Sequence, residues 1–378
     1  MRYFLFLCLI FQSLVGKSEN IEIDGIKYSL SNSKYTAEVV KNSYSGSIVI
    51  PEKIDYNGKT YDVTAIGKEA FNGCSSLTSL KLPNSILSIG DKAFQDCSSL
   101  ESFIIPDQIT MISISAFAGM KKLKSITIPS KAVRINDYAF QGCLNLKSIT
   151  FDGEIQQIGT DAFYGCDAIE EVYINDLVSF SGLFLWTVYS SPLSYTNHLY
   201  YKGEEIVDLF IPSEIDFVSR WAYRDCDFLR SVTIPNSVKR LQQGAFAECD
   251  NLKILVIGEN VYEFGDYTFS ECQALKDVYC YSKNVPNLPG YQMFKDCPLD
   301  EATLHVLPES VEEYKTHSPW KNFKNIVAIK DNDPNPQTSI THVERDFKQD
   351  TFFDLKGLSV KNPTKGIYIN RGKKVIIK

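Results

Sequence analysis

The chain has 378 residues, of which 44% are hydrophobic and 22% are charged, a composition typical of a folded protein with a large apolar core. Its formal net charge is −7 and its pI is near 5.3. Because no block rich in Lys and Arg stands out, nucleic acid is not expected as a partner.

The N-terminal segment MRYFLFLCLIFQSLVGKS has the composition of an export signal. One Arg precedes an apolar run from Phe4 to Val15, and small residues follow at Gly16 and Ser18. The run is too short to span a membrane and is typical of a cleaved signal peptide. We therefore expect residues 1–18 to be removed, the protein to be secreted or held at the cell surface, and no transmembrane segment to remain.

Residues 19–63 predict a cap made of β-hairpins. The sequences IDGI at Ile23 and YNGK at Tyr56 carry Asp-Gly and Asn-Gly turns between apolar segments, which is the strongest short-range hairpin signal. The sequence IVIP at Ile48 already has the pattern of the repeats that follow. We expect this cap to close the first edge of the repeat region.

A 23-residue period runs through residues 64–300. Each unit has a small residue, an aromatic residue and usually a Cys three positions later, as in AFQDC from Ala93 to Cys97, and then L-x-x-I/V-x-I/L. The aromatic position is occupied by Phe71, Phe94, Phe117, Phe140, Phe163, Tyr223, Phe246, Phe269 and Phe294. Such a period indicates a solenoid of stacked coils, in which the I/V-x-I/L segments form short strands of a parallel sheet.

The small residue, the aromatic ring and the Cys are expected in the core, where a short helical turn places the ring between coils. Metal binding is not expected, because the chain has no Cys-x-x-Cys and its four His are scattered. Disulfides are the rival interpretation in an exported protein. However, equivalent side chains of stacked coils point in parallel, and one unit has Met120 at the Cys position. We predict a ladder of buried, reduced thiols at Cys74, Cys97, Cys143, Cys166, Cys226, Cys249 and Cys272.

Residues 175–208 interrupt the array. An apolar part with Phe184 and Trp186 is followed by HLYYKGEEIVDL, which predicts a hairpin that turns at Lys202-Gly203. The favoured interpretation is a loop that packs Phe184 and Trp186 onto the solenoid. The alternative is an exposed aromatic recognition patch, because insertions in solenoids map to one face.

The period is lost again after the last repeat. Residues 301–330 offer Trp320 and Phe323 as the core of a C-terminal cap. Residues 331–342 read as a polar, proline-bearing linker that few contacts should cross. The linker resembles the start of a calcium loop, but Pro336 stands where that loop requires Gly, so no metal site is expected.

The repeats resemble those of the BspA-like leucine-rich repeat proteins, whose 23-residue units carry this A-F-x-x-C-x-x-L-x-x-I-x-I-P pattern. The resemblance covers roughly residues 48–329 and implies a leucine-rich repeat solenoid. Members of that family are mostly secreted or surface proteins of bacteria and of some mucosal protists, and several are described as adhesins. The resemblance therefore implies a partner that is a host extracellular-matrix or surface protein or glycan.

Residues 343–378 predict a small β meander, because Gly and Pro residues and an NRGK turn separate short apolar segments. The KGIYI…GKKV ending is similar to the type IX secretion sorting domains of Bacteroidetes. That resemblance implies an export or retention signal at this end of the chain.

No catalytic motif is recognisable, since the sequence has no nucleophile elbow, H-E-x-x-H, Walker loop or G-x-G-x-x-G. We expect no cofactor and no enzymatic activity, and a monomeric protein. The favoured function is adhesin-like binding, because a solenoid repeats a similar surface over many coils. The alternative is a secreted hydrolase or other enzyme with an unrecognised site in residues 175–208.

The outward position of each strand predicts the binding surface. It becomes aromatic around and beyond the insertion, at Tyr173, Phe210 and Tyr279. A second repeat position, a few residues before the outward one, forms a mostly basic stripe that includes Arg230 and Lys253. Rings beside cationic groups can hold a protein or a glycan, although the rings could equally be ordinary strand formers covered by the insertion.

Overall fold

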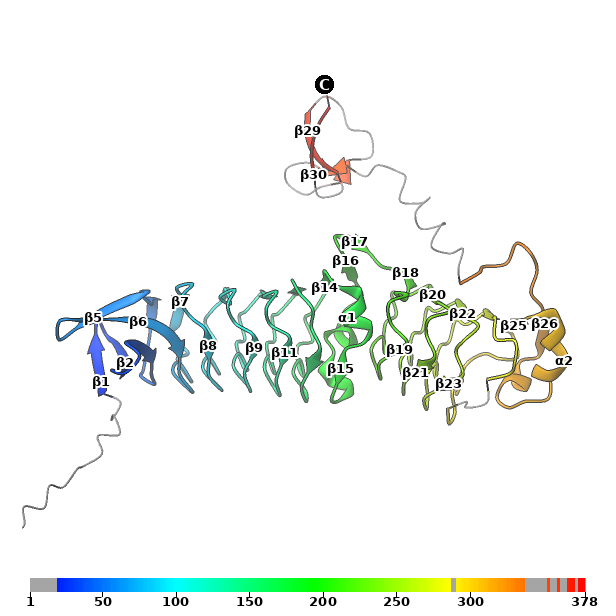
Figure 1. Cartoon of the computed structure of the whole chain (residues 1–378), viewed down its shortest axis with the longest axis horizontal. Helices are drawn as coiled ribbons and strands as arrows, with labels where there is room; N and C mark the ends of the chain where they lie inside the picture. Colours follow the sequence, from blue (N-terminus) through cyan, green and yellow to red (C-terminus); the bar gives the residue numbers. More distant parts are fainter. Residues whose placement is uncertain are drawn as a thin grey trace, which may run out of the picture.

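The computed structural model describes residues 19–286 and 290–336 and the backbone of four short strands in the tail. It is an elongated solenoid with a β cap at its N-terminal end and a mixed cap at its C-terminal end (Figure 1). The predicted signal peptide and residues 337–342 of the predicted linker lie outside the described residues. In the described part of the chain, no helix is long and apolar enough to cross a membrane.

The N-terminal cap is a mostly antiparallel sheet of order β1-β2-β3-β6-β5. Its strands are β1 (Glu19–Ile23), β2 (Ile26–Ser31), β3 (Thr36–Val39), β5 (Lys53–Tyr56) and β6 (Lys59–Ile66). Both predicted hairpins are present, with positive φ at both turn residues of Asp24-Gly25 and Asn57-Gly58, as a type I′ turn requires. Because β6 also pairs in parallel with β8 (Ser88–Ile89), a two-residue strand of the repeat region, the cap is continuous with the solenoid.

Most repeats contribute a strand to a long-strand side of the solenoid, drawn at the top of Figure 1. Before residue 207 these strands are β4 (Gly46–Val49), β7 (Leu77–Lys81), β10 (Ser125–Ile128), β12 (Ser148–Phe151), β14 (Glu171–Ile174), β16 (Leu199–Tyr201) and β17 (Glu204–Glu205). After it they are β18 (Asp208–Phe210), β20 (Ser231–Ile234), β22 (Ile254–Ile257), β24 (Asp277–Cys280), β25 (Thr303–Val306) and β26 (Asn325–Ala328). The pairing is parallel throughout except between β16 and β17, as predicted. The coil between β7 and β10 has no strand at the equivalent residues 103–105, so β7 pairs with β4 and not with β10.

A second set of two-residue strands forms a short-strand side, at the bottom of Figure 1, which the sequence did not predict. Its strands, besides β8, are β9 (Met111–Ile112), β11 (Arg134–Ile135), β13 (Gln157–Ile158), β15 (Phe184–Leu185), β19 (Phe217–Val218), β21 (Arg240–Leu241) and β23 (Glu263–Phe264). The second residue of each strand is buried. The Ile that precedes the Gly in many units was the signal for this side.

The predicted aromatic position forms a stack through the core. Neighbouring rings lie 5.3 Å apart from Phe117 to Phe140 and 5.7 Å apart from Phe246 to Phe269, nearly parallel in both pairs. These rings are fully buried, so the prediction that the ring wedges between coils is confirmed. The motif forms hydrogen-bonded turns, such as Cys97 N–H to the Phe94 carbonyl at 3.1 Å, and not regular helix.

Residues 175–208 are not the packed loop that was predicted but an extra coil. The short helix α1 (Leu177–Ser181), N-capped by Asp176, leads to β15, which pairs with β13, and the turns η1 (Val188–Ser190) and η2 (Pro192–Tyr195) lead to β16, which pairs with β14. The hairpin at Lys202-Gly203 is present as β16–β17. Because β17 pairs with the outer edge of β16, the sheet ends there and β18 starts a new one. We call this region, residues 175–210, the junction.

The C-terminal cap contains η3 (Pro308–Ser310), α2 (Val311–Tyr314) and η4 (Trp320–Asn322). Trp320 and Phe323 are buried as predicted, with the Trp320 ring edge-on to Phe294 at 5.6 Å. In the tail, β27 (Phe352–Phe353), β28 (Ser359–Val360), β29 (Gly366–Asn370) and β30 (Lys373–Ile377) form an antiparallel sheet of order β28-β27-β29-β30. The short strands are present, but β29 pairs with β27 and not with β28, so the sheet is not the meander that was predicted.

Residues 331–336 differ from the free linker that was predicted. They turn back from β26 over the long-strand side toward β22 (Figure 1). The Tyr281 hydroxyl donates a hydrogen bond of 2.6 Å to the Pro334 carbonyl, and Pro336 is buried. The carboxylate of Asp333 also lies near Tyr279 and Tyr281, so this part of the linker is held against the solenoid.

Candidate functional site

The residues at the outward position of the long strands differ in solvent exposure before and after the junction. Before the junction, Thr127 is exposed and Tyr173 is half-buried, whereas after it Val256 and Tyr279 are buried, with 2% and 9% of their surface exposed. Burial, together with the nearby carboxylates of Asp277 and Asp333, raises the pKa of Tyr279 to about 12. The predicted binding residue Tyr279 is therefore covered.

The three predicted ring residues do not form one surface. Tyr173 stacks on Tyr200 at 4.8 Å, and Tyr279 stacks on His305 at 4.2 Å. Phe210 lies on β18, the first strand of the second sheet, so the end of the first sheet separates it from Tyr173. The rings stand in one column of the sequence pattern, but the sheet that would join them is interrupted.

The predicted basic stripe is largely neutralised. Arg230 forms an ion pair with Asp208 at 3.1 Å. Lys124 and Lys147 pair with glutamates of neighbouring coils at 2.6 and 2.7 Å. Lys253 is exposed and forms no ion pair within the described residues. Exposed pairs of this kind add little to stability, and here they remove most of the positive charge expected beside the rings.

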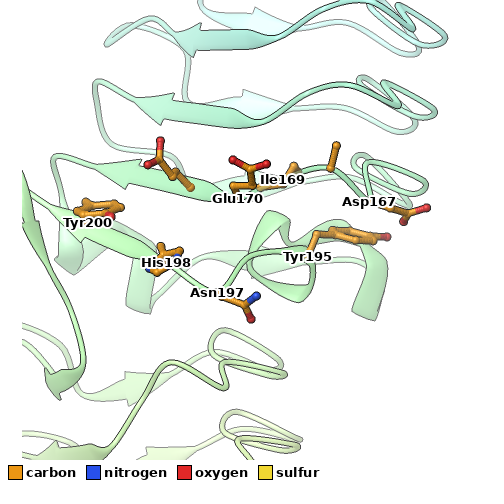
Figure 2. Close-up of a pocket in the computed structure, with 9 residues that line it drawn as sticks. Asp167, Ile169, Glu170, Tyr195, Asn197, His198 and Tyr200 are labelled. Carbon is orange, nitrogen blue, oxygen red and sulfur yellow. The ribbon is translucent and has the colours of Figure 1, made fainter.

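A surface hollow of about 470 Å³ lies where the first long-strand sheet ends. Figure 2 shows its residues on two successive coils, with Glu170 and Asp167 on one and Tyr200 and His198 on the next. Sequence reasoning missed Tyr200 and His198. The signal was present, because the segment LYY has the inward-outward-inward alternation of a repeat strand and places Tyr200 in the same column as Tyr173.

Carboxylates contact the polar atoms of Tyr173 and of His198, which neighbours Tyr200. The Tyr173 hydroxyl donates to Glu171 at 2.9 Å, and Nδ1 of His198 lies 2.5 Å from Glu205. Burial and the hydrogen bond to Glu171 raise the pKa of Tyr173 to about 12, so the phenol keeps its proton at physiological pH. We call Tyr173, Tyr200, His198, Glu171 and Glu205 the tyrosine patch.

The imidazole of the tyrosine patch is oriented by a carboxylate. Among the described residues, the ring of His198 makes its hydrogen bond with Glu205. The imidazole and the carboxylate are also 48% and 41% exposed. The patch therefore suits binding through ring surface and hydrogen-bond acceptors.

Phe184 and Trp186 lie at the same junction but on the short-strand side. They are 44% and 50% exposed, with ring centroids 5.4 Å apart in an edge-on arrangement. The coil that carries them packs through Leu183 and Leu185, which are buried. The two rings are thus presented to solvent and do not fill the core.

The cysteines of the predicted ladder are free and buried. Most donate their S–H to the carbonyl of the aromatic residue in the preceding coil, as Cys97 does to Phe71 and Cys143 does to Phe117, at 3.1 and 3.2 Å. This bond was not foreseen, and it explains why the position holds Cys in preference to an apolar residue of similar size. Burial raises the pKa of Cys97 to about 12, so this thiol keeps its proton at physiological pH.

A family model described as BspA type leucine rich repeat region matches residues 62–182 and 194–322. Among solved structures, a leucine-rich cell surface protein of Faecalibacterium prausnitzii is 17% identical over 83% of this chain and 96% of its own, with a TM-score of 0.36. A leucine-rich repeat protein of Bacteroides ovatus is 20% identical over 82% of this chain and 100% of its own, with a TM-score of 0.35. The pneumococcal vaccine antigen PcpA is 16% identical over 83% of this chain and 99% of its own, with a TM-score of 0.44. No curated protein gives a significant sequence match.

Proposed function

Because the chain belongs to the BspA-type leucine-rich repeat family, we propose that it is a non-catalytic, adhesin-like binding protein of the cell exterior. Solenoids of this kind expose a similar surface on every coil and suit extended partners. The predicted signal peptide supports secretion or surface display. We propose a host or microbial surface protein as the partner and a monomer as the binding form.

The observation that carries this proposal is the tyrosine patch. Tyr173 and Tyr200 form a stacked ring pair on the last long strands before the sheet ends, and their flanking carboxylates are solvent-accessible. Tyrosine supplies a large contact area at low entropic cost and is enriched at protein interfaces. Glu171 and Glu205 can accept hydrogen bonds from Lys or Arg of a partner. The patch therefore favours a protein surface with exposed basic residues.

The ends of the chain fit the same proposal. We propose that residues 1–18 direct export and that residues 343–378 act as a sorting or retention signal, similar to type IX tails. The folded binding unit would then extend from the N-terminal cap at residue 19 through the C-terminal cap at residue 330. The packed residues 331–336 would hold the tail at one end of that unit.

The test is binding of the protein to immobilised extracellular-matrix proteins and mucin, with and without the tyrosine patch. We expect Tyr173→Ser combined with Tyr200→Ser to weaken capture roughly tenfold or more, as loss of an interface hot spot does. The matched control is Tyr279→Ser, which changes the covered ring of the same column. Equal capture by the patch variant and the native protein would refute the assignment.

The hydrolase alternative is tested on the same fractions. Release of reducing ends or of peptides that is lost in His198→Asn would favour an enzyme at the junction. Binding without turnover, unaffected by that substitution, is the result we expect.

A further inference from the structure

The guanidinium of Arg220 is fixed between two aromatic rings on the short-strand side of the junction. It lies 4.8 Å from the ring centroid of Phe184 and 4.9 Å from that of Trp221. Its Nε donates to the Leu185 carbonyl at 2.9 Å. Stacking and this hydrogen bond together set the plane of the guanidinium, while its two terminal amino groups make no hydrogen bond with any described residue.

The charge of Arg220 is not neutralised. Arg224 and Arg230, close by in the sequence, each pair with a carboxylate, but within the described residues Arg220 forms no ion pair. The same holds for Arg240, which lies over the ring of Phe217 at 5.7 Å. An acidic protein thus holds two unpaired guanidinium groups beside aromatic rings on one side of the junction.

Trp221 lies at the left-handed turn position of its repeat, and the next coil leaves room for its ring. Its φ is +57°, and the equivalent residues of other coils have the same turn conformation, as Tyr138 does at +58° and Tyr267 at +57°. Gly244 occupies the equivalent position in the next coil, where a Cβ would lie 2.8 Å from Cδ1 of the indole. The glycine therefore leaves the room in which the Trp221 ring lies.

Phe184 and Trp186 extend this surface across the junction. Both are about half exposed, and Trp186 stands edge-on to Phe184. We call Phe184, Trp186, Arg220 and Trp221 the aromatic-guanidinium platform. It joins the coil before the break in the sheet to the coil after it, on the side opposite the tyrosine patch (Figure 1).

We propose that the aromatic-guanidinium platform binds a saccharide that carries a carboxylate, such as a sialic or uronic acid residue. Ring faces stack on the C–H surface of a sugar, and a fixed guanidinium binds a carboxylate through two parallel hydrogen bonds. Arg240 adds a second positive charge within reach of an extended oligosaccharide. This site differs from the tyrosine patch in position and in the charge of its ligand.

The experiment measures binding of sialyllactose and of a glucuronate-containing disaccharide to the mature protein by NMR titration, with lactose as the neutral control. We expect acidic saccharides to bind at least tenfold more tightly than lactose and to weaken with added salt. The sialic and uronic arms show which source of the carboxylate is preferred. Equal affinity for lactose, no binding in either acidic arm, or equal binding of a poly-glutamate peptide would overturn the proposal.

Three variants locate the site. Trp186→Ala removes an exposed ring and Arg220→Lys keeps the charge without the bidentate geometry; each should weaken binding of the acidic saccharide about tenfold. Because Arg220 also contacts Leu185 across the junction, the thermal unfolding of its variant is compared with that of Trp186→Ala. The Tyr173→Ser, Tyr200→Ser variant should bind the saccharide normally, which separates this site from the proposed protein-binding site. Unchanged affinity in Trp186→Ala and Arg220→Lys would place the saccharide elsewhere.

Discussion

Thr127, before the junction, and Thr233, after it, occupy the same position in their repeats. Thr127 is exposed, whereas only 6% of the surface of Thr233 is exposed. The ring stacks beneath them are alike, with Phe140 and Phe246 fully buried in both halves. The repeat pattern therefore determines the core, whereas segments outside the pattern determine the surface. Residues 331–336 lie beside Tyr279 and Tyr281 in the second half, and the β16–β17 hairpin ends the sheet of the first.

The largest effect that tests this comparison is removal of one ring from each stack. Phe140→Ala and Phe246→Ala should each lower the free energy of unfolding by about 3–5 kcal/mol, because both leave a cavity between coils. Urea denaturation measures the loss. The two values should agree within the scatter of such substitutions, since the core is the same in both halves.

Hydrogen exchange of the same two variants shows how far the damage spreads. In a solenoid each coil contacts only its neighbours, and the long-strand sheet is interrupted at the junction. Exchange should therefore increase mainly in the half that carries the substitution. In the urea measurement, a loss of unfolding free energy below about 1 kcal/mol in either variant would show that its ring is not part of a tightly packed stack.

High pH should destabilise both halves, because burial raises thiol pKa values in each, as at Cys97 before the junction and Cys249 after it. Burial raises the pKa of Cys97 and of Tyr28 to about 12, whereas an unfolded thiol and phenol titrate near about 8.5 and about 10. The unfolded state thus loses protons first as the pH rises. The stabilisation is complete below about pH 8 and is lost progressively between about pH 9 and pH 12. Denaturation midpoints over this range measure it.

Cys97→Ala is the matched control for the pH series. It removes one buried thiol and should make the fall of stability with pH shallower, at the expense of the hydrogen bond to the Phe71 carbonyl. The unit with Met120 shows that the stack accepts a side chain without a titrating group. A midpoint that does not change between pH 8 and pH 11 would contradict the raised pKa values.

Much of this fold could be predicted because the same core positions recur in each repeat of the sequence. The spacing of Phe and Cys located the ring stack and the thiol positions, and Asp-Gly and Asn-Gly turns located the cap hairpins. The short-strand side was missed because two-residue strands carry no alternation. The S–H bonds to carbonyls of the preceding coil were missed because they join residues 26 positions apart.

The candidate surfaces were harder to predict, for a physical reason. Exposure of a strand residue depends on what crosses over it, and Tyr279 is covered by a segment that reads as a free linker. The sequence predicted Tyr200 only as part of a hairpin, but its strand β16 also pairs in parallel with β14 as a repeat strand does. The contact of Arg220 with the ring of Phe184 could not be predicted, because the two residues lie in different coils on either side of the break in the sheet.

Removal of residues 331–378 should uncover the second half. We expect the free energy of unfolding to fall by about 1–2 kcal/mol, from one lost hydrogen bond and a small apolar contact. The pKa of Tyr279 should fall from about 12 toward its ordinary value, because burial is its main cause. Ultraviolet titration measures that change, and Tyr281→Phe, which removes only the bond to Pro334, should give part of it. An unchanged Tyr279 pKa in the truncated protein would show that these residues do not form the cover.

The smallest effect concerns the ring at which the second stack begins. Tyr223 stands where other coils have Phe, and its hydroxyl lies 2.7 Å from Oγ of Ser181 on α1. Since Ser181 donates to the Leu177 carbonyl at 2.8 Å, the phenol is the donor of the pair. Tyr223→Phe should lower the free energy of unfolding by about 0.5–1.5 kcal/mol.

A double-mutant cycle with Ser181→Ala isolates the contact from the packing of the ring. The coupling energy should be about 1 kcal/mol in favour of the native pair, since both groups are fully buried and each is the other's partner. This bond replaces, at the junction, the stacking that joins successive coils elsewhere. Additive effects of the two substitutions would mean that the halves are joined by the backbone bond from Ser219 to Ser181 and by apolar packing, without help from the hydroxyl pair.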